Sequence, residues 1–219
     1  MPRNHTVKQG DCLSSIAKKY GFPDYKVIWD DGSNAQLKQK RTNPNILFPG
    51  DVVVIPDIDL KQVDKSTEQT HNFVLDAGIV KLQLIIKDDE GKPYANCRYE
   101  LKIDDKKFDG TTDGSGKIIQ EITPDATSGE IALYSKEGET ESVITVFKLE
   151  LGHLDPVAEM TGIQARLNNL GFFCGKVDGI IGPMTEDALK AFQEKNGLSV
   201  TGSADQATKD KLAQLHDWQ

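Results

Sequence analysis

The chain has 219 residues, of which 37% are hydrophobic and 27% charged, a composition that suits two or three modest folded domains. The formal net charge is −8, with residues 1–56 basic and residues 57–155 acidic. A strongly basic face is missing, which argues against a nucleic-acid partner. Apolar runs long enough to span a bilayer are missing too, so we expect no membrane partner.

The N-terminal residues contain no hydrophobic segment typical of a secretory signal. We therefore expect cytoplasmic synthesis, with possible delivery to the periplasm or cell wall by a non-classical route. The cysteines, Cys12, Cys97 and Cys174, are scattered, and the histidines show no HExxH spacing. This pattern predicts reduced thiols and neither a metal centre nor a cofactor.

The first predicted element is a helix over residues 13–20, where apolar side chains recur at the spacing of one helix face. Asp11 is its predicted N-cap, which places Cys12 at the helix N-terminus. Unpaired amides at that position favour a thiolate, and a nearby histidine would supply a base. A nucleophilic role for Cys12 therefore stands beside a role as one residue of a binding loop.

A polar stretch follows, and "ILFPGDVVVIPD" then predicts a tight turn and a strand over residues 52–55. A strand at residues 5–7 is its expected partner, which gives the order β-α-α-β. The basic "NAQLKQKR" between them is open to two interpretations, an added helix or a mobile surface beside a groove.

Residues "HTVKQGDCLSSIAKKYGF" and "NPNILFPGDVVVIP" resemble the LysM domain, a small module that binds glycans containing N-acetylglucosamine. Two features depart from the family pattern. Threonine is common in the family where Cys12 stands, and residues 24–41 are longer than the usual second-helix region.

The resemblance implies a shallow sugar groove between two loops. By position, the groove residues are Gly10, Asp11, Cys12, Leu13 and Ser14 on one side and Asn45, Ile46, Leu47, Phe48, Pro49 and Gly50 on the other. Leu47 and Phe48 are suited to cover apolar sugar faces. In the alternative interpretation Leu13 and Ile46 belong to the core, and Gly50 serves the turn.

Residues 58–71 predict a linker, and residues 72–152 predict a domain of short strands. The expected strands fall within residues 79–88, 97–104, 109–122, 129–135 and 142–151, a spacing typical of a small antiparallel sandwich. The domain is similar to the prealbumin-like or carboxypeptidase-regulatory-like β-sandwich. The acidic "DGTTDGSG" is interpreted as a hairpin turn, with a calcium site as the alternative.

The last segment predicts three helices. The first begins at Asp155-Pro156, the second runs from about Pro183 to Asn196, and the third from Asp205 to about Leu215. Thr185 is a candidate cap for the second helix, and Phe192 is expected in the core.

Residues 163–215 closely resemble the type 1 peptidoglycan-binding domain, with Leu-Gly-Phe, Asp-Gly and Thr-Gly motifs in the expected order. The binding candidates that follow from this resemblance are Phe172, Asp178, Gly179 and Gly182. Cys174 is interpreted as a small filler within the loop.

The predicted fold class is multidomain α+β: a βααβ LysM module at 1–57, a linker at 58–71, an antiparallel β-sandwich spacer at 72–152, and a three-helix peptidoglycan-binding bundle at 153–219. The favoured function is a non-catalytic binder of peptidoglycan or N-acetylglucosamine-containing glycan. An accessory, adaptor or cargo protein of a type VI secretion-like contractile injection system, with spike or effector proteins as partners, is the second hypothesis. A cell-wall hydrolase is the third.

Overall fold

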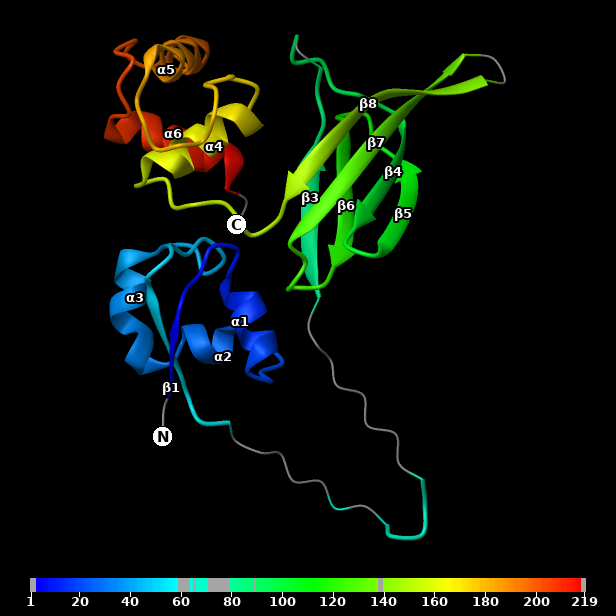
Figure 1. Cartoon of the computed structure of the whole chain (residues 1–219), viewed down its shortest axis with the longest axis vertical. Helices are drawn as coiled ribbons and strands as arrows, with labels where there is room; N and C mark the ends of the chain where they lie inside the picture. The colour runs from blue at the N-terminus through cyan, green and yellow to red at the C-terminus, as the bar shows by residue number, and fades with distance from the viewer. Residues whose placement is uncertain are drawn as a thin grey trace. The chain divides into compact units, whose positions relative to one another are not determined.

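A computed structural model describes residues 3–58, 64, 66–70, 79–88, 90–137 and 140–217 (Figure 1). The described residues form three hydrophobic clusters, one in each folded part of the chain. Much of the predicted linker at 58–71 lies outside the described residues. Among the described helices, none is both long and apolar enough to cross a membrane.

The first part combines a two-stranded antiparallel sheet with helices, as Figure 1 shows. Its elements are β1 (Arg3–Thr6), α1 (Leu13–Lys19), α2 (Lys26–Trp29), the 3₁₀ helix η1 (Gly32–Asn34), α3 (Ala35–Lys40) and β2 (Val52–Ile55). The strand β2 was predicted at these residues, whereas β1 begins and ends earlier than the expected 5–7. The "NAQLKQKR" stretch is helical, so the extra length of this region adds α3.

Buried apolar residues of α1, α2 and β2 form the core of this part, and a buried asparagine joins the elements. The Asn34 amide donates to the carbonyl oxygens of Ile28 at 2.8 Å and Val54 at 2.7 Å. Its own oxygen accepts the Val54 N–H at 2.8 Å. Asn34 therefore satisfies the outer edge of β2 in the way that a neighbouring strand would.

The middle part consists of two antiparallel sheets around a shared core (Figure 1). Its strands are β3 (Val80–Ile85), β4 (Arg98–Ile103), β5 (Lys106–Thr111), β6 (Lys117–Ile122), β7 (Ser128–Glu137) and β8 (Thr140–Glu150). One sheet is β3-β6 and the other is β5-β4-β7-β8. On β4, Tyr99, Leu101 and Ile103 are buried while Glu100 and Lys102 are exposed, which is the alternation of a half-buried strand.

The "DGTTDGSG" stretch differs from its prediction as a hairpin turn. It joins β5 to β6, and these strands lie in different sheets. Asp113 Oδ1 accepts the backbone N–H groups of Ser115 at 2.8 Å and Lys117 at 2.9 Å. The turn therefore passes the chain from one sheet to the other, and the Asp113 carboxylate serves its backbone.

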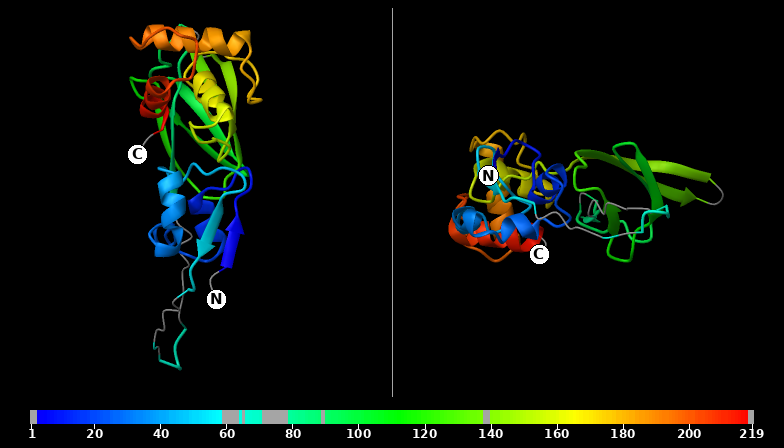
Figure 2. Two further views of the ribbon diagram at one scale, coloured as in Figure 1. Left: turned by 90° about the vertical axis from the view of Figure 1, so that its left-hand side faces the viewer. Right: turned by 90° about the horizontal axis from the view of Figure 1, so that it is seen from below.

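The last part contains α4 (Met160–Asn169), α5 (Pro183–Lys195) and α6 (Gln206–His216), with α5 lying across the other two (Figure 2). Both α5 and α6 begin where the sequence predicts, after Gly182 and Asp205. The first helix begins later than the predicted Asp155-Pro156, because the chain first makes a turn from Pro156 to Glu159. A Cβ atom on Gly162 would lie 2.1 Å from the Pro156 carbonyl oxygen, so glycine allows this turn to pack on α4.

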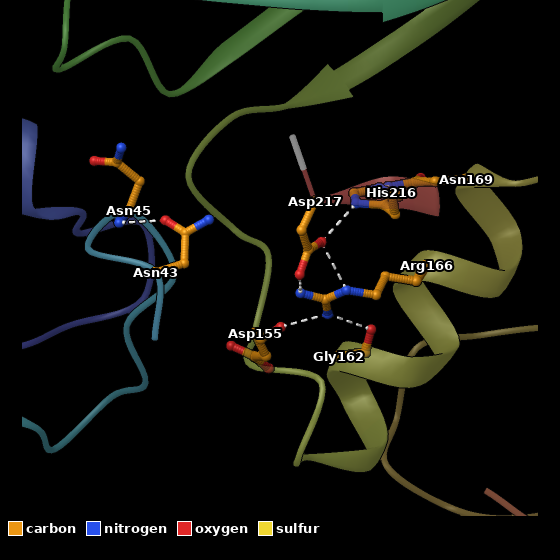
Figure 3. Close-up of polar contacts among 8 residues, drawn as sticks. All are labelled: Asn43, Asn45, Asp155, Gly162, Arg166, Asn169, His216 and Asp217. Atoms are coloured by element: carbon orange, nitrogen blue, oxygen red, sulfur yellow. Dashed lines mark hydrogen bonds and ion pairs between the residues drawn. The ribbon is translucent and has the colours of Figure 1, made fainter. Parts of the chain in front are cut away.

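A fully buried arginine ties the end of α6 to α4 (Figure 3). Arg166 donates from Nη1 to the carbonyl oxygens of Asp155 and Gly162, both at 2.8 Å. Its Nε and Nη2 donate to the two carboxylate oxygens of Asp217 at 2.9 and 2.7 Å. Burial alone would raise the pKa of Asp217, but hydrogen bonds from His216 and Arg166 and their charges lower it below its usual range.

We expect Arg166→Ala to lower the free energy of unfolding of the last part by about 3–5 kcal/mol, because it removes two charge-assisted hydrogen bonds from the largely buried Asp217 carboxylate, which keeps its contact with His216. Lys209→Ala, on α6, is the matched control and should change it by less than about 0.5 kcal/mol. Circular dichroism during urea unfolding measures both. Equal stability of the two variants would show that the buried pair contributes nothing.

Candidate functional site

The two loops predicted to form the sugar groove are adjacent in the structure. The Leu13 N–H donates to the Pro44 carbonyl oxygen at 3.2 Å. The Ser14 hydroxyl donates to Asn45 Oδ1 at 3.0 Å. The Asn45 N–H donates to Asn43 Oδ1 at 2.9 Å, as Figure 3 shows. The start of α1 and the loop before β2 therefore form one continuous surface.

Burial divides the predicted groove residues into two groups. The side chains of Leu13, Ser14 and Leu47 are buried, so Leu47 cannot cover a sugar face as predicted. Ile46, which the alternative interpretation placed in the core, is half-buried, as are Gly10, Asp11, Cys12, Phe48 and Pro49. Asn45 and Gly50 are exposed. The accessible apolar side chains of the second loop are those of Ile46, Phe48 and Pro49.

The Gly-Asp turn at the first loop is held by a buried histidine. Asp11 Oδ2 accepts the Lys8 N–H at 2.8 Å and lies 2.9 Å from His5 Nε2. The His5 Nδ1 atom lies 3.2 Å from the Tyr20 hydroxyl, and the two rings meet edge to face. Asp11 therefore fixes the turn to β1, and it is not the helix cap that the sequence predicted.

Cys12 is the N-cap of α1. Its backbone is extended, and its Sγ accepts the Ser15 N–H at 3.4 Å while the Ser15 hydroxyl accepts the Cys12 N–H at 3.0 Å. This reciprocal pair is a capping box, with a cysteine in the place usually taken by serine or threonine. The hydrogen bonds of His5 go to Asp11 and Tyr20, so the geometry favours a capping role for Cys12 over a nucleophilic one.

The second loop rests on a buried ion pair. Asp51 accepts from Arg41 Nε at 2.7 Å, from Lys40 Nζ at 2.8 Å and from the Phe48 N–H at 3.0 Å. Burial alone would raise the pKa of Asp51, but these hydrogen bonds and the Arg41 charge lower it to about 2. The Arg41 guanidinium also lies over the Phe48 ring, 5.7 Å from its centre. Residues contributed by α3 and its C-terminal end thus position the loop, a role that the sequence analysis did not assign.

In the last part, a buried glutamine holds the loop that contains Asp178 and Gly179. Gln164 is 1% exposed, and its Oε1 accepts the N–H groups of Asp178 at 3.1 Å and Gly179 at 2.8 Å. Its Nε2 donates to the Ile180 carbonyl at 3.0 Å and to Thr185 Oγ1 at 3.3 Å. We name this arrangement the first glutamine clamp.

The same arrangement recurs around Gln193 on α5, as the second glutamine clamp. Its Oε1 accepts the N–H groups of Thr201 and Gly202, both at 2.9 Å. Its Nε2 donates to the Ser203 carbonyl at 2.8 Å and to Thr208 Oγ1 at 2.9 Å. The sequence signal for both clamps is a helix glutamine followed by Asp-Gly or Thr-Gly and by a threonine in the first turn of the next helix.

The predicted binding residues of this part occupy different environments. Asp178 and Gly179 are exposed, and Gly182 is the N-cap of α5. The N–H of Ile180 and the Gln164 amide lower the pKa of Asp178. Phe172 is half-buried against Phe192, with ring centres 5.3 Å apart, so it belongs mainly to the core.

The structure also tests the predicted roles of Thr185 as a helix cap and of Cys174 as a filler. Thr185 lies at the third position of α5 and accepts from Gln164, so it is a clamp residue and the predicted capping role is wrong. Cys174 is buried among core residues, as expected of a filler, and burial raises the pKa of its thiol.

Comparison with protein families identifies both end domains. Residues 5–56 match the LysM domain, and residues 157–212 match the family described as putative peptidoglycan binding domain. Both resemblances expected from the sequence are thereby confirmed, as is the mixed α+β class. The chain carries two domains of wall-binding type, while the resemblances of the middle sandwich and of the whole arrangement to injection-system proteins stay predictions.

Curated relatives match over short stretches. The spore cortex-lytic enzyme of Oceanobacillus iheyensis is 48% identical over 56 residues, which are 26% of this chain and 20% of the relative. The spore cortex-lytic enzyme of Bacillus cereus is 52% identical over 50 residues, which are 23% of this chain and 19% of the relative. The match thus spans about a fifth of each relative's length. No solved structure matches the chain.

The cysteine cap generates a graded prediction. Because sulfur is a weak acceptor, Cys12→Ser or Cys12→Thr should raise the free energy of unfolding of the first part by up to about 1 kcal/mol, and Cys12→Ala should lower it by about 0.5–1 kcal/mol. Urea unfolding followed by Trp29 fluorescence, in a Trp218→Phe background, measures the series. Loss of sacculus binding in Cys12→Thr would instead indicate a thiol required in the groove.

Asp51 generates a pH prediction. Its pKa falls from 3.8 in the unfolded chain to about 2 in the fold, so its contribution to stability is present above pH 4 and is lost as the pH falls toward 2. Between pH 6 and pH 2 this loss amounts to about 2 kcal/mol. The same fluorescence assay should show this extra acid sensitivity in the parent and not in Asp51→Asn. Parallel pH curves for the two proteins would contradict the assignment.

Proposed function

We propose that the chain is a non-catalytic binder of peptidoglycan that uses both end domains. The observation that carries this proposal is the presence of two wall-binding domain types in one chain. In each of them, buried polar side chains hold the candidate loops in place. Such loops meet a ligand with little loss of conformational entropy.

In the LysM domain, the loop geometry suits an N-acetylated sugar. The Ser14 hydroxyl engages the oxygen of the Asn45 side chain, which leaves its NH₂ group as the donor toward an acetamido carbonyl. Phe48, backed by the Arg41 guanidinium, offers a half-buried ring for an apolar sugar face. Gly50 has a φ of 93° and nothing within 4 Å of an added Cβ, so the backbone there is open to a ligand.

Two binding domains on one chain act through linkage. Once one domain is bound to the polymer, the second contact is intramolecular, and avidity rises by about 10² to 10⁴ when the geometry permits both contacts. Two individually modest sites thereby suffice for stable attachment to a repetitive polymer.

Two other functions stay as alternatives. The names of the relatives in Oceanobacillus and Bacillus favour a wall-lytic enzyme, but the matched stretch covers only about a fifth of those proteins. The order of the domains favours an accessory or cargo role in a type VI secretion-like contractile injection system, a hypothesis that rests on arrangement alone.

Incubation with purified sacculi distinguishes these functions. We expect the chain to sediment with sacculi without reducing their turbidity. Asn45→Ala combined with Phe48→Ala should weaken binding at least tenfold, because it removes the proposed donor and ring of the LysM groove. Soluble N-acetylglucosamine oligomers should compete in the parent and lose most of their effect in this variant.

Lys38→Ala, an exposed change in the same domain, is the matched control and should bind like the parent. Clearing of the sacculi would establish a lytic enzyme. Absence of sedimentation would overturn the proposal. Co-purification with spike proteins from cells that encode a contractile apparatus would favour the accessory role.

A further inference from the structure

Five exposed apolar side chains gather on the α4–α5 connection and the first turn of α5. We name this set the apolar loop surface: Phe173, Val177, Ile180, Ile181 and Met184, which are 73%, 42%, 67%, 51% and 52% exposed. Several exposed large apolar side chains within one short stretch of chain indicate a binding site, because a solvated loop has no need of them. Three residues that the sequence analysis selected, Asp178, Gly179 and Gly182, lie within the same stretch.

The second glutamine clamp provides an internal comparison. Residues 177–185 and 200–208 correspond position by position, with valine first, Asp-Gly or Thr-Gly next, the helix cap at Gly182 or Asp205, and threonine last. In this alignment, Ser203 and Ala204 correspond to Ile180 and Ile181. The clamp contacts only the backbone carbonyl at the first of these two positions.

Folding therefore does not require isoleucine at either position, since the second loop makes the same hydrogen bonds with serine and alanine. Exposed isoleucine also gains little from burial in its own domain. These side chains are therefore available for contact with a ligand, and the first clamp holds their backbone in place before any such contact forms.

We infer that the apolar loop surface is the contact of this domain with the short peptides of peptidoglycan. The inference rests on the proposed function and specifies which component of the polymer this domain takes. Only one of the five side chains, Phe173, is aromatic, and the others suit the methyl and alkyl groups of a peptide better than the flat face of a sugar. Lys176, exposed between Phe173 and Val177 in sequence, supplies a positive charge for a peptide carboxylate.

The test transfers the second loop's residues to the first. Ile180→Ser with Ile181→Ala, in the full chain, should weaken binding to intact sacculi about tenfold or more. Val200→Ser, which removes a 55% exposed apolar side chain from the second loop, is the matched control and should bind like the parent. Unchanged thermal unfolding by circular dichroism verifies that the double variant is folded.

A second arm identifies the ligand. Sacculi stripped of their peptides by an amidase should bind the parent and the double variant equally weakly, with the remaining attachment through the LysM domain. The inference is overturned if the double variant binds intact sacculi like the parent. It is also overturned if the parent still binds more tightly than the double variant, by the same factor, after the peptides have been removed from the sacculi.

Two further outcomes are separated by the same measurements. A parent that does not bind intact sacculi refutes the proposed function itself. Concentration-dependent self-association in sedimentation velocity, abolished in the double variant while sacculus binding is unchanged, would assign the surface to contact with a second copy and overturn the inference.

Discussion

The hydrogen bonds from one buried glutamine amide to the backbone of a loop determine how the last domain is built. A primary amide both donates and accepts, so Gln164 satisfies two adjacent N–H groups and one carbonyl of a loop that has no strand or helix partner. Without these partly buried bonds, the N–H and carbonyl groups of the loop that face Gln164 would lose their protein partner. This one side chain holds residues 178–180 of the connection between α4 and α5.

In the first domain, other side chains bind the backbone groups that have no strand or helix partner. Asn34 satisfies the open edge of β2, and Asp51, paired with Arg41, accepts the Phe48 N–H in the loop before β2. Each of these small domains has a limited apolar core, so its loops are held by buried polar side chains in addition to apolar residues such as Leu47 and Cys174. Because the polar contacts lie beneath the candidate binding loops, stability and site geometry depend on the same residues.

The sequence predicted those features that depend on local patterns. β2, α5 and α6 have the strand residues or caps that define their ends, and the structure places them accordingly. Local patterns gave the wrong prediction where a contact with a residue distant in sequence determines what a side chain binds. Asp11 has the composition of an N-cap, but His5 engages its carboxylate and Cys12 takes the cap. Leu47 and Ile46 are chemically similar neighbours, and only the packing against the core determines that Leu47 is buried. The glutamine clamps join residues from two helices and the loop between them, so the pattern of a single helix or turn does not identify them. Their signal is the repeated order of glutamine, a residue followed by glycine, and threonine.

The correspondence of the two clamps gives α5 a double role. Its first turn contains Thr185, which completes the first clamp, and its C-terminal half contains Gln193, which begins the second. Unfolding of α5 would therefore break hydrogen bonds of both clamps at once. The domain is thus a pair of overlapping helix–loop–helix units that share one helix. Because they share it, local opening of one unit lowers the stability of the other, and the two loops form a single cooperative unit.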